Sequence, residues 1–420
     1  MRAMISVEEA LRIVGLAAGS PRARGERVDV AAALGRVLTE DVRLDLDMPP
    51  FDRSAMDGYA VRAADVRADA LPRRLRVVAH VLAGGAATRA LAEGEAMAIM
   101  TGAPLPDGAD LVIPIEWTSE PDAIRGQETR VRIDHTAPSG SHVARRGEQA
   151  RAGESVAHAG LRISPALVGA MAAAGRSTVE VAKAPSVEIL ATGDELVSLD
   201  RRPVASQIRD SNGHALLAQT RAAGGSGTYR GPVADDGDRL RTAISSALAA
   251  DIVILTGGVS VGEKDLVPAV LLGLGVECLF HKWAVKPGGP LWFGRRGETL
   301  VFGLPGNPAA AFVGFELLVA PAIGVRLGRP FVPRDVVRAR PSSPLPAPVS
   351  RRQYVPVTLD LSVSPATATA VRSAGSGDPF GLARAHGFAV VYAAGPTAHA
   401  AADGLVDVIP ALAAGLWGSS

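Results

Sequence analysis

Residues 251–265 read DIVILTGGVSVGEKD. An aliphatic run followed directly by glycines is typical of a buried parallel strand and the turn after it. Open α/β sheets bind ligands beyond the carboxyl ends of such strands. The turn glycines let the backbone approach a bound group, and a helix predicted over 266–275 would direct its positive end towards that group. Because Glu263 and Asp265 would repel a bare anion, a divalent cation between carboxylates and phosphate is the simplest ligand set. The stretch predicts a site for metal and phosphate.

Length and charge narrow the class of protein. A chain of 420 residues is too long for one ordinary core, so we expect several domains. The balance of 44 Lys and Arg against 43 Asp and Glu does not favour nucleic acid or a membrane surface as the main partner. A small-molecule partner is the better prediction.

Cysteine usage and the N-terminus bear on the compartment. The single cysteine, Cys278, excludes an internal disulfide framework and a multi-cysteine zinc site within one chain. Glu8 and Glu9 stand where a signal peptide would need an apolar core, and Ser6 with Glu9 reads as a capping box. The weakly polar run over 309–325 is interrupted and too short for a membrane span. We predict a cytoplasmic protein without a membrane segment.

The pattern along the chain changes several times. Residues 1–45 read as amphipathic helices, and 46–150 as short β segments separated by Gly, Pro and Asp. A helix is predicted over 164–175, packed back on the N-terminal helices. From 185 the pattern is strand, turn and helix in repetition, which predicts an α/β domain with a mainly parallel sheet. After about 330 a Pro-rich linker precedes alternating segments, which predict a small β-barrel or sandwich.

Acidic residues recur at the turns of the predicted α/β domain, at Asp194, Glu195, Asp210, Asp235, Asp236 and Asp265. If these turns share the carboxyl edge of one sheet, the carboxylates converge into a site suited to Mg²⁺. Taken singly, each is better explained as a helix cap. Taken as a group, they favour a metal site.

Lysine usage gives a second indication of anion binding. Only four of the 44 basic residues are lysine, and Lys264, Lys282 and Lys286 fall within one stretch. Compact ammonium groups suit phosphate or oxyanion binding, although chance and surface solvation explain the cluster equally well. In GLPGNPAAA, 303–311, Asn307 can cap and Pro308 can begin a helix whose backbone N–H groups are then available to an anion.

Two loops earlier in the chain carry weaker signals. PPFDRSAMDGYAV, 49–61, places Asp57 beside Tyr59 in a loop flanked by Pro and Gly, and MTGAPLPDGADLVIP, 100–114, contains Thr101. Either loop is equally well explained as a polar turn that enters a strand.

Taken in order, seven motifs resemble one family. They are SAMDGYAV (54–61), TGAPLPDGAD (101–110), RRGE (145–148), TGDEL (192–196), GGVSVGEKD (257–265), KPGGPLWFG (286–294) and GLPGNPAAA (303–311). Together they resemble the MoeA family of molybdopterin molybdenumtransferases, which includes the E domain of gephyrin. The resemblance runs from about residue 5 to residue 412.

The resemblance implies a fold and an assembly. The fold class is α/β plus β and multidomain. Residues 1–45 and 151–184 would form a split helical or linker domain, 46–150 an inserted β-rich domain, 185–329 an α/β molybdopterin-binding domain, and 330–420 a C-terminal β-barrel. The family forms an elongated homodimer, so the loops of Asp57 and Thr101 are expected to complete the site on the partner subunit.

The resemblance also implies an activity and its residues. The family takes adenylylated molybdopterin, hydrolyses the adenylate in a Mg²⁺-dependent step, and places molybdate on the dithiolene sulfurs. Expected partners include a molybdopterin adenylyltransferase and molybdoenzyme acceptors. The expected catalytic residues are Asp57, Thr101, Glu195, Asp235, Asp265, Lys282 and Lys286, of which Asp235, Asp265 and Glu195 would hold Mg²⁺. The expected molybdopterin contacts are Gly257, Gly258, Ser260, Asp210, Ser211, Asn212, Pro305, Gly306, Asn307, Pro308 and Ser376.

Three alternatives stay open at this level. Gln149 and Gly289 replace an acidic residue and a lysine that the family pattern usually carries, which would suit a divergent molybdopterin-binding paralogue with weak or no transferase activity. GVSVG, 258–262, matches the nucleophile elbow of a serine hydrolase built on Ser260, with His281, His386 and His399 as the candidate bases. A non-enzymatic scaffold like gephyrin would need an exposed partner-binding groove.

Overall fold

The computed structural model describes residues 4–19, 23–119, 129–259, 266–392 and 404–411. The chain divides into two compact units. Unit 1 comprises Met1–Arg27, Gly35–Thr39 and Glu180–Ser420, and unit 2 comprises Val28–Leu34 and Glu40–Val179.

Unit 1 is built on a six-stranded sheet in the order β16-β13-β17-β21-β20-β18. The strands are β13 (Ser186–Thr192), β16 (Ser226–Val233), β17 (Ile252–Thr256), β18 (Glu277–His281), β20 (Trp292–Arg296) and β21 (Thr299–Leu304). The first four strands in the order are parallel, and β20 runs antiparallel to both of its neighbours. The predicted mainly parallel sheet is therefore confirmed. Thr256 pairs with both Ala191 and Leu304, so three strands end level at one edge.

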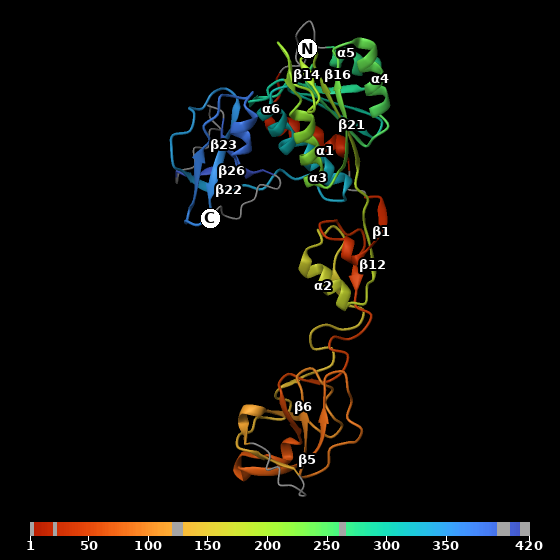
Figure 1. Cartoon of the computed structure of the whole chain (residues 1–420), viewed down its shortest axis with the longest axis vertical. Helices are drawn as coiled ribbons and strands as arrows, with labels where there is room; N and C mark the ends of the chain where they lie inside the picture. Colours follow the sequence, from red (N-terminus) through yellow and green to blue (C-terminus); the bar gives the residue numbers. More distant parts are fainter. Residues whose placement is uncertain (1–3, 20–22, 120–128, 260–265, 393–403, 412–420) are drawn as a thin grey trace. The chain divides into compact units, whose positions relative to one another are not determined.

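Helices cover both faces of this sheet (Figure 1). Along β17, Ile252 and Ile254 point into one hydrophobic cluster, whereas Val253 and Leu255 point into another. The first cluster includes α3 (Asn212–Ala223), α6 (Pro308–Gly314) and α7 (Ala320–Arg326), and the second includes α4 (Gly237–Ala247) and α5 (Val267–Gly273). Because both faces are buried, the strand needs the unbroken aliphatic run seen in the sequence.

The helix α6, a π-helical segment over Phe315–Val319, and α7 form one continuous run in the core. Among the described residues, this run, Pro308–Arg326, is long and apolar enough to cross a membrane. However, 89% of its apolar stretch is buried inside the protein. Its Glu316 is 1% exposed and accepts a hydrogen bond of 3.0 Å from Gln219 Nε2, while Arg334 Nε lies 3.4 Å from its other oxygen. Burial against the sheet accounts for the apolar composition.

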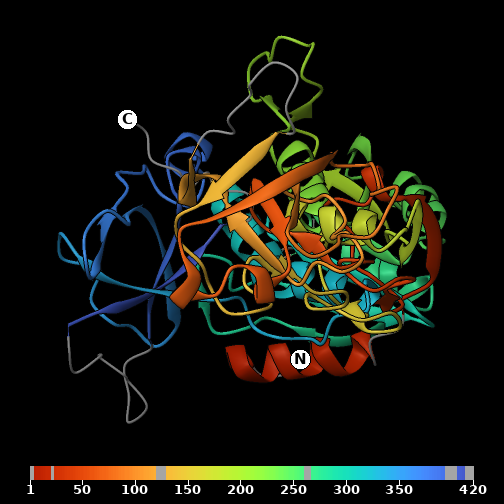
Figure 2. The same ribbon diagram turned by 90° about the horizontal axis from the view of Figure 1, so that it is seen from below.

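A closed barrel follows the α/β layers within unit 1. Its strands are β22 (Val337–Pro341), β23 (Arg352–Asp360), β24 (Ala366–Ala370), β25 (Gly387–Val391) and β26 (Val406–Pro410). They run in the order β23-β24-β22-β26-β25, and pairing of β23 with β25 closes the ring. The barrel lies at the blue end of the colour scale in Figures 1 and 2. A short helix, α8 (Pro379–Ala383), lies between β24 and β25, and β19 (Val285–Lys286) pairs with β23, which joins the α/β part to the barrel.

Unit 2 contains the predicted β-rich segment. Its main sheet has the order β7-β4-β6-β5-β9-β8. The strands are β4 (Gly58–Val61), β5 (Arg73–Val81), β6 (Glu95–Ile99), β7 (Leu111–Pro114), β8 (Thr118–Ser119) and β9 (Arg130–Ile133). Two short pairs accompany it, formed by β2 (Val42–Arg43) with β11 (Ser155–Ala157) and by β3 (Arg53–Ser54) with β10 (Val143–Ala144).

The N-terminal residues differ from the all-helical expectation for 1–45. The helix α1 (Val7–Ala18) begins at the predicted capping box, where Ser6 Oγ accepts a 3.1 Å hydrogen bond from Glu9 N–H. The chain then forms β1 (Gly25–Asp29), which pairs with β12 (Thr178–Ala182), and a 3-10 turn, η1 (Val30–Ala32).

The packing of the helix over 164–175 on the N-terminal helices is confirmed for one of them, η1. The apolar face of α1 packs on α7 in unit 1, and Figure 2 shows α1 in red near the N label. The helix α2 (Pro165–Ala173), capped by Ser164, belongs to unit 2 and contacts η1 and β11. The N-terminal partner of α2 is therefore the short 3-10 turn η1.

Candidate active site

A cavity of about 1780 Å³ lies at the carboxyl edge of the unit 1 sheet. Its walls come from the ends of β13, β17 and β21, from the start of α3, and from the loop that follows β19. The barrel contributes residues 371–383 and the start of β23. The short pair β14 (Leu196–Val197) and β15 (Ile208–Arg209) contributes a further wall.

Most of the predicted site residues line this cavity. They are Glu195, Asp210, Ser211, Asn212, Asp235, Gly257, Gly258, Lys286, Pro305, Gly306, Asn307, Pro308 and Ser376. Lys282 belongs to unit 1 but is not part of this lining, and Asp57 and Thr101 belong to unit 2. Ser260 and Asp265 lie outside the described residues.

Asn212 links two of the cavity loops. Its Nδ2 donates hydrogen bonds to Thr256 Oγ1 at 3.1 Å and to the Gly306 carbonyl at 2.7 Å. The Thr256 hydroxyl in turn donates to the Pro305 carbonyl at 3.1 Å. The start of α3 therefore holds the loops after β17 and β21 in fixed positions.

Asp210, two positions before Asn212, fixes the start of α3. Its carboxylate is 2% exposed, accepts the Gly213 N–H at 3.1 Å, and accepts the hydroxyl proton of Tyr229. Burial, together with the Asp210 carboxylate, raises the pKa of Tyr229, so the phenol remains a hydrogen-bond donor. Asp210 thus acts on the cavity through the backbone of α3. Tyr229 comes from the edge strand β16, and no motif in the sequence indicated it.

The turn after β17 passes directly over Thr192. A Cβ on Gly257, whose φ is +90°, would lie 2.3 Å from the Thr192 carbonyl oxygen. A Cβ on Gly258, at φ +60°, would lie 2.8 Å from the Thr192 hydroxyl. Only glycine fits both positions. The Thr192 hydroxyl is buried and has no hydrogen-bond partner among the described residues, a cost that the sequence did not reveal.

One carboxylate beside this turn, and a second in the same cavity, are of the kind that binds a magnesium ion. Asp235 Oδ1 lies 3.9 Å from the position that a Cβ on Gly258 would occupy, and Glu195 also lines the cavity. In the described part of the chain, no group of three or more His, Cys, Asp or Glu side chains is placed to hold a metal. Mg²⁺ commonly takes one or two protein carboxylates and completes its shell with water and substrate phosphates. Asp235 and Glu195 fit that mode of binding.

The expected anion site at the start of α6 is corrected. Asn307 occupies the cap position, but its side chain makes no capping bond and donates instead to Ser376 Oγ at 3.1 Å. The Ser376 carbonyl accepts the Ala309 N–H at 3.1 Å, and the next two amides bond to the Asn307 carbonyl. Pro308 has no N–H, and the N–H groups of the three residues after it already donate to these carbonyls. No backbone donor in this first turn is therefore left for an anion. The barrel loop, which is distant in sequence, closes this helix end.

Cations come from three elements of the cavity wall. Arg209 lies on β15, and its Nε donates to backbone carbonyls of the preceding loop. Lys286 ends β19, three positions before Gly289. A Cβ on Gly289 would lie 3.1 Å from an Arg351 guanidinium nitrogen, so a barrel cation stands beside the position where the family pattern carries lysine. Arg351 lies just before β23, and no motif in the sequence pointed to it.

In unit 2, Asp57 and Thr101 form a preorganised pair. The Thr101 N–H and hydroxyl donate to Asp57 Oδ1 at 2.7 and 2.8 Å, and these bonds lower the pKa of Asp57. Nearby, the RRGE motif is structural: Arg145 donates to Asp52 at 2.6 Å and Arg146 to Asp47 at 2.7 Å. The loops of unit 2 are thus tied together by charge-assisted hydrogen bonds.

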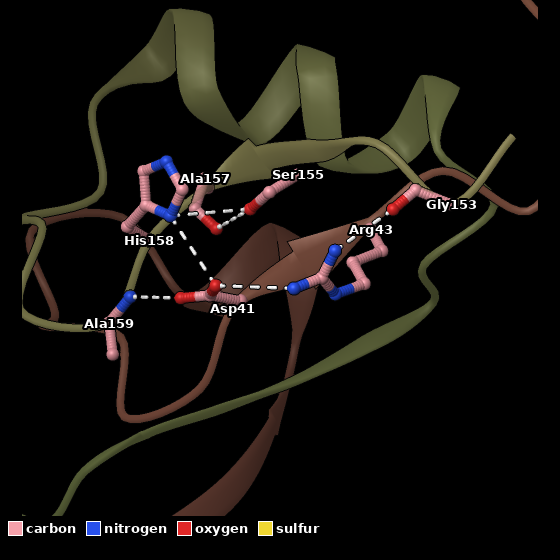
Figure 3. Close-up of polar contacts among 7 residues, drawn as sticks. All are labelled: Asp41, Arg43, Gly153, Ser155, Ala157, His158 and Ala159. Atoms are coloured by element: carbon pink, nitrogen blue, oxygen red, sulfur yellow. Dashed lines mark hydrogen bonds and ion pairs between the residues drawn. The ribbon is translucent and has the colours of Figure 1, made fainter. Parts of the chain in front are cut away.

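A group of Ser, His and Asp in unit 2 imitates a hydrolytic triad (Figure 3). Both the Ser155 hydroxyl and an Asp41 carboxylate oxygen lie 3.4 Å from the same His158 nitrogen, Nδ1. A working triad needs them on opposite nitrogens. The Ser155 hydroxyl instead donates to the Ala157 carbonyl at 3.1 Å, so this group is not a nucleophile site.

Two of the histidines named for a hydrolase at Ser260 bond to backbone groups, and His281 does so at the residue directly before Ser260. His281 Nε2 lies 2.8 Å from the Val259 carbonyl, and His386 Nδ1 bonds to the backbone of Leu359. His399 lies outside the described residues.

An α/β sheet with a cavity at the carboxyl ends of its parallel strands is the architecture of an enzyme that binds a small molecule. Residues 5–175 match the family model described as the MoeA N-terminal region, domains I and II, and residues 188–324 match a probable molybdopterin binding domain. The chain belongs to the MoeA family of molybdopterin molybdenumtransferases.

Individual relatives support this assignment. The molybdopterin molybdenumtransferase of Bacillus subtilis (strain 168) is 36% identical over 325 residues, which cover 77% of this chain and 75% of the relative. Molybdopterin molybdenumtransferase 1 of Mycobacterium tuberculosis (strain ATCC 25618 / H37Rv) is 36% identical over 374 residues, which cover 84% and 85%. A crystal structure of a molybdopterin biosynthesis MoeA protein from Pyrococcus horikoshii matches with a TM-score of 0.78 at 31% identity, over 97% of this chain and 99% of that one. The chain is a transferase of molybdenum cofactor biosynthesis.

Proposed function

We propose that this transferase hydrolyses adenylylated molybdopterin in a Mg²⁺-dependent step, releases AMP, and places molybdate on the dithiolene sulfurs. The observation that carries the proposal is the single cavity that brings Asp235, Lys286 and the Gly257–Gly258 turn to one sheet edge. A pyrophosphate needs cations and backbone donors on one side and a metal-compatible carboxylate on the other.

The roles of the chain's own residues follow from their charge. Lys286 and Arg351 are the cations of the cavity wall that would bind phosphate or molybdate oxygens. The glycine turn allows the backbone to approach the phosphates closely. Asp235 and Glu195 would hold Mg²⁺, which when bound would neutralise charge on the departing phosphate. Water supplies the oxygen that AMP or the molybdopterin phosphate gains when the bond between the phosphates breaks.

We also propose a cytoplasmic homodimer with a composite site. The support from this chain is the fixed Asp57–Thr101 pair, which presents a preorganised carboxylate on a unit 2 loop. In the dimer, the loops of one subunit would complete the cavity of the other. A molybdopterin adenylyltransferase would supply the substrate, and molybdoenzymes would accept the product.

The test is turnover of purified protein with adenylylated molybdopterin and molybdate, with Mg²⁺ or with EDTA. We expect AMP and metallated cofactor to form only with Mg²⁺. Asp235→Asn should lower the rate by about 100-fold, because one metal-compatible carboxylate is lost. Tight binding without AMP release would instead favour the divergent paralogue, and AMP release that EDTA leaves unchanged would contradict the metal assignment.

A further inference from the structure

The side chain of Phe380 is an exposed aromatic ring in the cavity wall. It is 76% exposed, compared with 68% for Leu16 and 64% for Val204, and it belongs to the lining of the cavity. A single exposed apolar side chain on a surface needs no explanation. An exposed ring inside a ligand cavity has a use, because flat heterocycles stack on aromatic faces.

The backbone that carries this ring is rigidly held. The Asp378 carboxylate accepts hydrogen bonds of 3.0 Å from the N–H groups of Ala374, Phe380 and Gly381. Leu382, two residues further on, packs against the core cluster that includes residues of α6. The ring therefore remains accessible while the backbone that carries it is fixed, and this lowers the entropy cost of a stacking contact.

The substrate of the proposed function supplies two flat heteroaromatic systems, a pterin at one end and an adenine at the other. We propose that Phe380 stacks on one of these rings and so selects for a substrate that carries a planar heterocycle. This inference rests on the proposed function. Aromatic–base stacking of this kind changes affinity by about 5- to 100-fold when the aromatic residue is replaced by alanine.

The experiment compares Phe380→Ala, Phe380→Leu and Phe380→Trp with the wild-type chain. Kd is measured for adenylylated molybdopterin, for molybdopterin and for AMP. We expect Phe380→Ala and Phe380→Leu to weaken binding of adenylylated molybdopterin by about 5- to 100-fold, and Phe380→Trp to preserve it, because leucine keeps the apolar volume but not the π face. Leu361→Ala, an exposed barrel residue that is not part of the cavity lining, is the matched control and should leave every Kd unchanged.

The Kd values for the separate ligands identify which substrate ring, pterin or adenine, Phe380 contacts. Loss of AMP affinity alone assigns the contact to adenine, and loss of molybdopterin affinity alone assigns it to the pterin. Wild-type affinities in Phe380→Ala, with or without a change of oligomeric state on size-exclusion chromatography, would overturn the proposal while the proposed function stands. A wild-type chain that binds none of the three ligands would overturn the proposed function itself.

Discussion

At the scale of single residues, the cavity wall contains two threonines, Thr192 and Thr256, that are equally buried but differ in their hydrogen bonds. Thr256 accepts from Asn212 and donates to Pro305, whereas the Thr192 hydroxyl has no partner among the described residues. A buried hydroxyl without a partner costs free energy, and removing it can be neutral or stabilising. The two residues are a matched pair for mutation.

Thr192→Val should raise the free energy of unfolding by about 1 kcal/mol, since valine keeps the shape and removes the unsatisfied group. Thr256→Val should lower it by about 1–3 kcal/mol, because Asn212 loses an acceptor and Pro305 loses a donor. Thermal melting of both variants measures the difference. A loss of stability in Thr192→Val comparable to that in Thr256→Val would show that the Thr192 hydroxyl is bonded.

Asp52 gives a prediction of pH dependence. The Arg146 backbone N–H and the Arg145 guanidinium lower its pKa in the folded state. Stability from this carboxylate is therefore fully present above its unfolded pKa of about 3.9 and is lost as pH falls through the lower folded value. Because the side chain is partly exposed, solvent screening limits the effect to about 1 kcal/mol.

The melting temperature of Asp52→Asn should accordingly fall below that of the wild type at pH 7, and the gap should close below about pH 3.9. Asp69→Asn is the control, because both side chains of the Arg67–Asp69 pair are mostly exposed to solvent. A gap for Asp52→Asn that stays constant from pH 7 to pH 3 would contradict the ionic origin.

At the scale of elements, the site depends on strands that end level and on a turn that only glycine can make. The pairing of Thr256 with Ala191 and Leu304 brings three loops to one edge. The turn then folds back over Thr192, with two successive residues at positive φ. The geometry of this turn is set by the strand beside it.

Gly257→Ala should weaken binding of adenylylated molybdopterin by at least about 10-fold, because the new Cβ would lie 2.3 Å from the Thr192 carbonyl oxygen and the turn must move. Gly84→Ala is the control for strain alone, since Gly84 has φ +82° with nothing within 4 Å of the added Cβ. Both variants should lose about 1 kcal/mol from the φ strain, and only Gly257→Ala should lose affinity. Equal affinity in the two variants would show that the geometry of this turn does not affect ligand binding.

At the scale of the whole molecule, the proposed homodimer would make activity depend on residues from two subunits. If the Asp57 loop of one subunit serves the Asp235 cavity of the other, a dimer of Asp57→Asn with Asp235→Asn has one intact site. Random exchange in an equal mixture makes half of the dimers mixed, so activity should recover to about a quarter of the wild-type value.

The measurement is AMP release by each variant alone and by the refolded or co-expressed mixture. The control is a mixture of Asp235→Asn with Lys286→Ala, two residues of the same unit 1 cavity, for which mixed dimers contain no intact site. No recovery in the test mixture would place Asp57 and Asp235 in a site that one subunit forms by itself. Recovery in the control would show that Asp235 and Lys286 do not serve the same cavity.

The sequence alone was sufficient for the local features that follow from side-chain period and turn chemistry. The aliphatic run of β17, the glycine turn after it, and the caps of α1 and α2 were all predicted, because each depends on residues within one turn or strand. The edge strand β16 was not predicted, since SGTYRGPV carries glycines and a proline that weaken the strand pattern.

Tertiary structure decided what covers the cavity. Ser376 reaches Asn307 across 69 positions of the chain, and Arg351, Tyr229 and Phe380 enter the site or support it from elements whose motifs carried no signal. Period and capping report which face of an element is buried, but they do not report which distant element buries it. The chain's own pattern therefore determined the buried strand β17, the glycine turn after it and the family, whereas the closed end of α6 and the aromatic wall of the cavity follow from packing between remote segments.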